Sequence, residues 1–353
     1  MQTVHVSTYC LPSSYGSILQ ALGLKSALAE LGYPSVVEQV TQPPQENYKL
    51  PLTFRSPAQL IATAQRCLLY PRLRAKYKNT CRFIAEHIDT AYYPSLSAMK
   101  DALKEESLFL AGSDQIWRPD QLMAEFFLEF APEGAKRLSY AASMGILDVP
   151  GEKKQEFSRL LRNFDSISVR ESDSVPIVSS FSGKPAQAHI DPTFLCDSSQ
   201  WRQLERPYPI RRPYILVYPI YWNPNLNAAL KKLHHETGKD ILVLGNYRRN
   251  VYANKWIFDA DPGQFLWLID HADSVVSSSF HGAALALNFN KPTVPVINPA
   301  SPSRLNSLLS TLDCPALSIE DLAKTAPDFT QVNRKIAEEK DRAMAYLKEV
   351  LAP

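Results

Sequence analysis

The sequence lacks the features that mark several large classes of protein. Its five cysteines are scattered and never form a C-x-x-C pair, so neither a disulfide framework nor a zinc site is predicted. No window holds the roughly 18 apolar residues that a membrane-spanning helix needs. Lysine and arginine total 38 against 36 acidic residues, a net charge of +2, which argues against a dedicated nucleic-acid binder. The N-terminal residues lack the basic stretch and apolar run of a signal peptide, so we expect a cytoplasmic protein.

What the chain does have is the length and composition of ordinary globular domains. It holds 353 residues, of which 45% are hydrophobic and 21% are charged. Short apolar runs alternate with segments of helical periodicity, which is the pattern of parallel α/β sheets. The runs that predict strands are 4–6, 36–37, 108–110, 137–141, 166–169, 188–190, 214–218, 241–244, 274–276 and 293–296. The segments that predict helices are 21–31, 225–236, 262–270 and 331–351.

A proline-rich stretch divides these elements into two groups. Residues 206–213 hold three prolines in eight positions, which remove backbone donors and fix φ, so we interpret them as a linker. Residues 1–205 before it form an N-terminal α/β domain, with a helical, basic insertion at about 41–107. Residues 214–325 form a C-terminal α/β domain, and 326–353 form a helix that we expect to pack back on the first domain. The predicted fold class is α/β, with two Rossmann-like domains that face each other across a cleft.

The insertion carries a run of charge of one sign. Between Arg66 and Arg82 there are six positive side chains and no acidic one. A solvated helix face is the simpler interpretation. The alternative is a patch that contacts an anionic acceptor or a membrane surface, which the neighbouring Tyr70 and Tyr77 would suit.

Loops that directly follow strands are the first candidates for a site, because ligands of open parallel sheets bind beyond the carboxyl ends of the strands. The loop 13–17 leads into a helix whose free backbone N–H groups can hold an anion or sugar hydroxyls. A plain turn at Gly16 is the alternative interpretation. The loop lacks G-x-G-x-x-G, so a dinucleotide site is not favoured.

A second loop, residues 111–117, groups side chains that suit a sugar. Asp114 and Gln115 can accept and donate hydrogen bonds to hydroxyls, and Trp117 can stack on the apolar face of a ring. Asp114 can also act as a general base toward a hydroxyl. The alternative is a capping aspartate with a tryptophan in the core.

A third loop, residues 168–171, brings Arg170 to the edge of the predicted sheet. A guanidinium there can bind a phosphate or carboxylate through two parallel hydrogen bonds. Pairing with Glu171 or Asp173 at the surface is the alternative.

A fourth loop, residues 277–284, places three serines and His281 at the start of a helix rich in small residues. The positive end of a helix is also where a phosphate binds. A lone histidine is most often structural, but a histidine at a strand-to-helix turn favours a functional role.

Taken in order, these segments resemble the polysaccharide pyruvyl transferase family. The matching segments are Tyr15–Gln20, Gly112–Trp117, Tyr140–Gly145, Ser168–Glu171, Asp191–Thr193, Ser279–Gly282 and Ser303–Leu305. The resemblance implies a fold similar to that of the two-domain GT-B glycosyltransferases. It also implies a reaction in which the enolpyruvyl unit of phosphoenolpyruvate is transferred to two hydroxyls of a sugar in a bacterial polysaccharide repeat unit. The products are a pyruvate ketal and phosphate.

The same resemblance suggests a role for each candidate residue. His281 is expected to protonate the methylene carbon of the donor, because imidazole ordinarily titrates near neutral pH, and Asp114 is expected to be the base. The expected donor-binding residues are Arg170, Arg304, Ser278, Ser279, Gly282, Lys291 and Ser303. The expected acceptor-binding residues are Tyr15, Gly16, Ser17, Gln20, Ser113, Gln115 and Trp117. No metal-ligand cluster is evident, so we expect no metal and no cofactor, with phosphoenolpyruvate as a co-substrate.

Two positions depart from the family pattern. Ser279 stands where many members have arginine, and Ser14 stands where asparagine is common. Arg304, Arg170 or Lys291 would therefore have to neutralise the donor.

The expected partners follow from the reaction. They are phosphoenolpyruvate and a sugar or polyprenyl-diphosphate-linked oligosaccharide, with no nucleic acid. A lipid-linked acceptor would place the enzyme at the inner face of the membrane, with contact through Arg66–Arg82. Two other functions stay open, a GT-B nucleotide-sugar glycosyltransferase and a non-catalytic glycan-binding module.

Overall fold

The N-terminal lobe is built on a parallel sheet. A computed structural model describes residues 2–40, 57–210, 213–223, 226–245, 251–299, 303–324 and 327–352. The strands of the first sheet are β1 (Val4–Ser7), β2 (Ser35–Val40), β3 (Thr90–Tyr93), β4 (Leu108–Ala111) and β5 (Lys136–Ser139), in the order β3-β2-β1-β4-β5. A parallel pair, β6 (Ile167–Val169) and β7 (Ala186–Ala188), continues this sheet through isolated bridges from Leu138 to Ser166 and from Ala142 to Val169.

The C-terminal lobe repeats the same plan. Its strands are β8 (Tyr214–Tyr218), β9 (Asp240–Leu244), β10 (Lys255–Ile257), β11 (Ser274–Ser277) and β12 (Thr293–Pro295). They pair in parallel in the order β10-β9-β8-β11-β12. The prediction of an α/β fold with two parallel sheets is confirmed.

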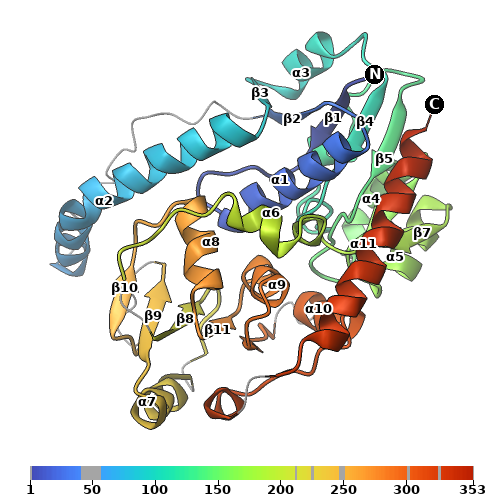
Figure 1. Ribbon diagram of the computed structural model, residues 1–353. Helices are drawn as coiled ribbons and strands as arrows, with labels where there is room; N and C mark the ends of the chain where they lie inside the picture. Colours follow the sequence, from blue (N-terminus) through green and yellow to red (C-terminus); the bar gives the residue numbers. More distant parts are fainter. Residues whose placement is uncertain are drawn as a thin grey trace.

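Helices alternate with these strands along the chain (Figure 1). The α-helices are α1 (Tyr15–Glu30), α2 (Pro57–His87), α3 (Leu96–Ala102), α4 (Lys154–Leu161), α5 (Ser174–Ser182), α6 (Ser198–Arg202), α7 (Leu226–Thr237), α8 (Pro262–Asp270), α9 (Phe280–Asn288), α10 (Ser303–Thr311) and α11 (Thr330–Leu351). Short 3-10 helices are η1 (Ala124–Phe127), η2 (Gly151–Lys153), η3 (Pro192–Phe194) and η4 (Glu320–Ala323).

The strand orders place the candidate loops at equivalent points of the two sheets. In the first sheet, β2 and β3 are added on one side of β1, and the chain then crosses to add β4 and β5 on the other side. The second sheet does the same, with β9 and β10 on one side of β8 and β11 and β12 on the other. The order of the strands therefore reverses between β1 and β4 and between β8 and β11. A crevice forms at the carboxyl ends of the strands at such a switch point. The loops after β1 and β4 lie at the first crevice, and the loop after β11 lies at the second.

The two lobes contact each other through an apolar core that includes residues of both. Tyr15 of α1 stacks on Phe265 of α8, and its hydroxyl donates to the carbonyl of Ala260 at 2.5 Å. In the other direction, the Asn288 amide of α9 donates to the carbonyls of Thr193 and Cys196. The switch points of the two sheets are thereby held close together.

The C-terminal helix crosses back to the N-terminal lobe, where its stripe of apolar residues is buried. The Tyr346 hydroxyl of α11 donates to the carbonyl of Ser139, and the Tyr33 hydroxyl donates to the carbonyl of Leu351. Figure 1 shows α11 running from the C-terminal lobe to the end of the first sheet.

Some predicted boundaries are wrong. The segment predicted as an insertion, 41–107, contains β3, which pairs with β2, so most of it is a regular crossover with an unusually long helix. Residues 41–56 lie outside the described part of the chain. The strand predicted at 188–190 is β7, which ends at Ala188. The strand β10 at 255–257 was missed because three residues show too little alternation.

Candidate functional site

His281 lies in the first turn of α9, at the contact between the lobes. The buried strand β11 ends in hydroxyl side chains, and Ser279 caps the helix by accepting the N–H of Gly282 at 3.3 Å. Small side chains then let α9 pack closely against the rest of the core. The His281 side chain is 9% exposed.

The partner of His281 is Asp191, which comes from the N-terminal lobe. The distance from His281 Nε2 to Asp191 Oδ2 is 3.6 Å. The Asp191 carboxylate is fully buried and accepts hydrogen bonds from Ser113, Thr193 and Arg170. Burial alone would raise the pKa of Asp191, but His281 and Arg170 hold that pKa well below its usual range. Asp191 is therefore a carboxylate that faces the imidazole across the lobe boundary.

The other side of the His281 ring is covered by the beginning of α1. A Cβ atom at Gly16 would lie 2.3 Å from His281 Nδ1, so only glycine allows this approach. Two helix N-termini, those of α1 and α9, thus meet at one histidine. Their aligned backbone dipoles favour negative charge at this point.

Arg170 and Arg304 are two cations beside this histidine and carboxylate pair. The Arg170 guanidinium is buried, donates to Glu171 at 3.1 Å and to Asp191 at 3.0 Å, and lies 3.9 Å from the ring centroid of Phe280. Burial and the neighbouring Arg170 lower the pKa of Arg304. Glu171 and Asp191 offset much of the positive charge of Arg170, so an anion bound here would meet a cluster that already contains charges of both signs.

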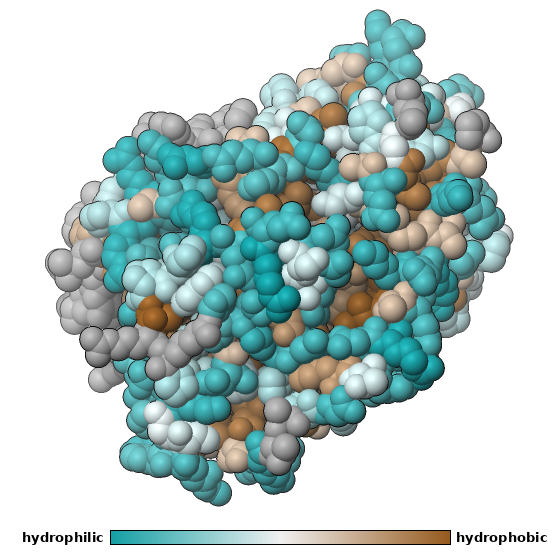
Figure 2. All heavy atoms as spheres, in the orientation of Figure 1, coloured by the Kyte–Doolittle hydropathy of each residue, from teal (hydrophilic) through white to brown (hydrophobic). Residues whose placement is uncertain are grey.

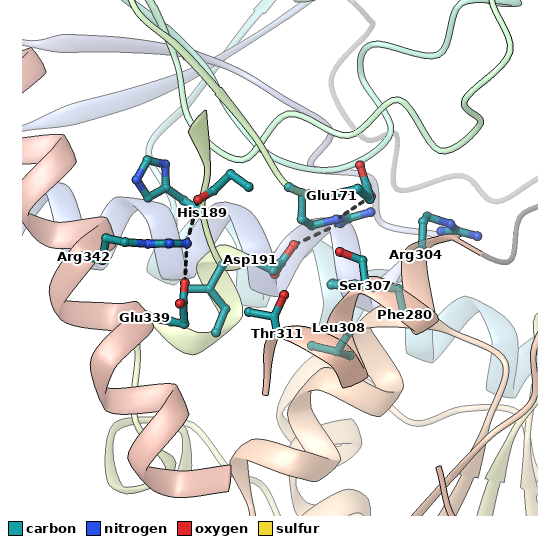
Figure 3. Close-up of a pocket in the computed structure, with 13 residues that line it drawn as sticks. Glu171, His189, Asp191, Phe280, Arg304, Ser307, Leu308, Thr311, Glu339 and Arg342 are labelled. Atoms are coloured by element: carbon teal, nitrogen blue, oxygen red, sulfur yellow. Dashed lines mark hydrogen bonds and ion pairs between the residues drawn. The ribbon is translucent and has the colours of Figure 1, made fainter. Parts of the chain in front are cut away.

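A narrow cavity lies between the lobes beside Arg170, Asp191 and Arg304 (Figure 3), and His281 is not among the residues that line it. Its volume is about 30 Å³, and its walls come from the β6–β7 region, α9, α10 and α11. Figure 3 shows Glu171 and Arg304 at one end, His189 and Arg342 at the other, and Asp191 between them. A volume of this size holds only one or two water molecules.

An open groove of about 300 Å³ lies on the N-terminal lobe at the carboxyl ends of β1 and β4. It is lined by Asp114 and Gln115, by Ser17, and by Arg118, among others. Asp114 has φ of 74°, a left-handed conformation that a residue other than glycine rarely adopts, and its carboxylate accepts the N–H of Gln115 at 2.8 Å. The half-exposed Asp114 carboxylate is thus held at the groove wall.

Three predicted acceptor residues are buried away from this groove, and the prediction for each is wrong. Trp117 is fully buried, stacks on Phe127 and donates from Nε1 to the carbonyl of Phe126 at 3.1 Å. Gln20 is fully buried and donates to Thr8 and to the carbonyls of Tyr9 and Ser17. Ser113 is fully buried and positions Asp191.

Tyr15 and Gly16 also do not face the groove. Tyr15 joins the two lobes, and Gly16 packs on His281, so neither has room for an acceptor. Of the predicted acceptor residues, Gln115 lines the groove together with the predicted base Asp114. Ser17 lies at the groove wall, but its hydroxyl is buried and bonded to the backbone of Leu11 and Ser14.

The predicted donor residues are also divided by the fold. The Ser278 hydroxyl donates to the carbonyl of Tyr221, and Ser279 caps α9. A Cβ at Gly282 would meet Ser277 and Tyr218 inside the C-terminal lobe.

Lys291 and Ser303 complete this set. Lys291 pairs with Asp270 at 3.6 Å, beyond the far end of α9 from His281, so its assignment to the donor is wrong. Ser303 is buried at the first residue of α10, next to Arg304.

One histidine and carboxylate cluster occurs among the described residues with atoms near enough to share a metal, namely Glu205, Asp270 and His271. Both oxygens of Asp270 already accept hydrogen bonds from Arg202, at 2.9 and 3.0 Å. The positive charges of Arg202 and Lys291 oppose a divalent cation at this place.

Sequence reasoning missed the role of Asp191. The available signal was that Asp191 begins an Asp-Pro-Thr segment directly after a predicted strand. That segment is one of those by which the chain resembles the family. No local pattern shows that this carboxylate meets a histidine 90 residues later.

Comparisons with known proteins agree with this architecture. The family model described as polysaccharide pyruvyl transferase matches residues 15–300. No curated protein matches the chain significantly. Among solved structures, UDP-GlcNAc 2-epimerase from Neisseria meningitidis, bound to UDP-GlcNAc, is 13% identical, with 99% of each chain covered and a TM-score of 0.55. UDP-GlcNAc 2-epimerase from Methanocaldococcus jannaschii is 8% identical, with 99% of each chain covered and a TM-score of 0.54. At these identities the likeness shows the fold alone, which is of the GT-B type.

Proposed function

Because this chain belongs to the polysaccharide pyruvyl transferase family, we propose that it moves the enolpyruvyl unit of phosphoenolpyruvate onto two hydroxyls of a sugar. The sugar belongs to a bacterial polysaccharide repeat unit, and the products are a pyruvate ketal and phosphate. The observation that carries the proposal is the meeting of His281 with Asp191 beside two arginines at the lobe boundary.

The charges of the site suit the donor. Phosphoenolpyruvate brings a carboxylate and a phosphate, which require fixed cations and backbone N–H donors. Arg170 and Arg304 supply the cations, and the N-termini of α1 and α9 supply the dipoles. The cavity of about 30 Å³ is smaller than the donor, so the proposed cycle requires the lobes to separate before the donor enters.

The residues then divide the chemistry between them. His281, whose Nε2 lies 3.6 Å from the Asp191 carboxylate, transfers a proton to the methylene carbon of the donor, and C2 becomes electrophilic. A first sugar hydroxyl adds to C2 while Asp114 takes its proton. The C2–O bond to phosphate then breaks, and a second hydroxyl adds to close the ketal. In the proton balance, Asp114 takes one hydroxyl proton and His281 gives one proton to the new methyl group. The proton of the second hydroxyl leaves with phosphate.

The acceptor is assigned to the groove of the N-terminal lobe. Asp114 and Gln115 line it with groups that bind hydroxyls. A polyprenyl-diphosphate-linked oligosaccharide would bring the enzyme to the inner face of the membrane. In the described part of the chain, no helix has both the length and the apolar character to cross a bilayer.

The test is phosphate release from phosphoenolpyruvate across a panel of hexose and lipid-linked acceptors. His281→Ala should lower the rate by about 10²–10⁴-fold, the usual contribution of a general acid. His235→Ala is the matched control, because His235 is exposed on α7 and distant in the fold from the lobe contact. A near-normal rate in His281→Ala would remove His281 from the mechanism.

The same panel separates the other functions. Stabilisation of the protein by nucleotide sugars, without stabilisation by phosphoenolpyruvate, would indicate a glycosyltransferase. Binding of sugars with no effect of either donor would indicate a glycan-binding module.

A further inference from the structure

A groove separate from the site described above lies between α2 and β3 on the N-terminal lobe. Its volume is about 440 Å³, within the range of ligand-binding pockets. It is lined by Tyr77, Lys78, Cys81, Arg82, Ile84, Ala85, Thr90 and Tyr92. Figure 1 shows α2 extending from this region away from the sheet. No part of the proposed reaction uses this groove.

The charged side chains along the groove are all positive. Arg74, Lys78 and Arg82 are exposed and four residues apart, so they form a single row along α2. Helix α2 has no acidic residue before Glu86. Within the described ranges, none of the three pairs with a carboxylate, whereas Arg72 on the neighbouring face pairs with Asp259 at 2.8 Å. Figure 2 shows hydrophilic surface along this part of the molecule.

The walls of the groove combine these cations with flat rings and hydroxyls. Tyr77 and Tyr92 are half-buried, so each presents part of an aromatic face with a polar tip. Thr90 adds a hydroxyl from β3, the edge strand of the sheet. Rings for stacking and polar groups for hydroxyls are what a sugar requires, and cations at the rim add a preference for negative charge.

We propose that the α2–β3 groove binds a carboxylate- or phosphate-bearing segment of the glycan acceptor, away from the sugar that reacts. This inference rests on the proposed function, in which the N-terminal lobe holds the acceptor. Lys78 and Arg82 contact the anionic groups, and Tyr77 and Tyr92 contact the rings between them. The groove selects an extended anionic glycan over a short or neutral one.

Binding is measured by calorimetry with three hexasaccharide probes, namely oligomannuronate, a phosphorylated mannan oligosaccharide and neutral mannohexaose. At least one anionic probe should bind about tenfold or more tightly than the neutral one, and this preference should weaken with added salt. Lys78→Ala/Arg82→Ala should abolish the preference. Lys100→Ala/Lys104→Ala is the control, because it removes the same charge from exposed positions of the same lobe.

Three results would overturn the inference. They are equal binding of the neutral probe, a preference that survives in Lys78→Ala/Arg82→Ala, and binding of phosphatidylglycerol vesicles without binding of either anionic oligosaccharide. The last result would assign the basic row to a membrane surface. Circular dichroism of each variant shows that the fold is retained.

A kinetic arm separates this inference from the proposed function. With a monosaccharide acceptor, Lys78→Ala/Arg82→Ala should release phosphate at the normal rate, whereas with an anionic oligosaccharide its KM should rise about tenfold or more. If no acceptor supports phosphate release but the binding pattern holds, the proposed function fails and the groove assignment stands. If phosphate is released normally and the variant changes neither binding nor KM, the groove assignment fails alone.

Discussion

Substitution of Gly16 by alanine tests the contact between α1 and His281, the proposed general acid. The new Cβ would lie 2.3 Å from Nδ1, 2.6 Å from Cγ and 2.8 Å from Cβ of His281, whereas ordinary contact begins near 3.4 Å. The ring must therefore move by about 1 Å, a displacement that can lower an enzymatic rate by about 100-fold. Overpacking costs about 1–3 kcal/mol of unfolding free energy, and the higher helix propensity of alanine offsets up to about 1 kcal/mol of this. The protein should remain folded while phosphate release falls steeply.

The assay compares Gly16→Ala with Gly151→Ala, in which the added Cβ meets no atom within 4 Å. Phosphate release from phosphoenolpyruvate gives the rate, and the proton resonances of the imidazole give the position of His281 independently of activity. Gly151→Ala should match the wild type in both measurements. If Gly16→Ala shifts the His281 resonances but turns over at the normal rate, the histidine is not required in its present place. If neither changes, the contact itself is wrong.

Two further substitutions test a structural side chain and a titrating one. Trp117→Phe should lower the free energy of unfolding by about 1–3 kcal/mol, because the carbonyl of Phe126 loses its buried hydrogen-bond donor. The KM for the acceptor should stay unchanged. A raised KM in a variant with a normal urea midpoint would restore Trp117 to the acceptor site. Burial and the nearby Asp270 carboxylate raise the pKa of Glu205 to about 7. The folded state therefore holds an extra proton between the ordinary pKa of glutamate, 4.5, and about 7, so this group makes stability fall as the pH rises through that window. Glu205→Gln should lose less stability than the wild type between pH 5 and 8 in urea titrations, and identical pH profiles would contradict the assignment.

Two partly exposed ion pairs, one of them beside Glu205, also join the lobes. Arg202 of α6 donates to Asp270 of α8, and Arg72 of α2 pairs with Asp259 beyond β10. Both contacts bridge from the N-terminal lobe to the C-terminal lobe at a distance from the cavity. The separation of the lobes that we propose for donor entry must break or stretch such pairs, which are partly exposed and individually weak.

Local sequence was enough to predict the parallel α/β sheets and the loops that carry the site. Apolar runs and helical periodicity depend on neighbours a few residues away, and a loop after a parallel strand lies at the carboxyl edge of the sheet wherever the strand is placed. The positions of His281, Arg170 and Asp114 therefore followed from order along the chain. The strands β3 and β10 did not, because short strands are defined by the partners with which they pair.

Only the tertiary structure decided which way each side chain in those loops faces. Trp117 and Gln115 are two residues apart, yet the first lies in the core and the second lines the groove, because packing against Phe127 and Phe164 decides between them. His281 contacts Asp191 and Gly16 only because the two lobes pack together, and both partners lie far from His281 in the sequence. Periodicity is a short-range property of a chain, whereas burial and the pairing of charges arise from the approach of distant segments, and this approach is what turned separate loops into a site.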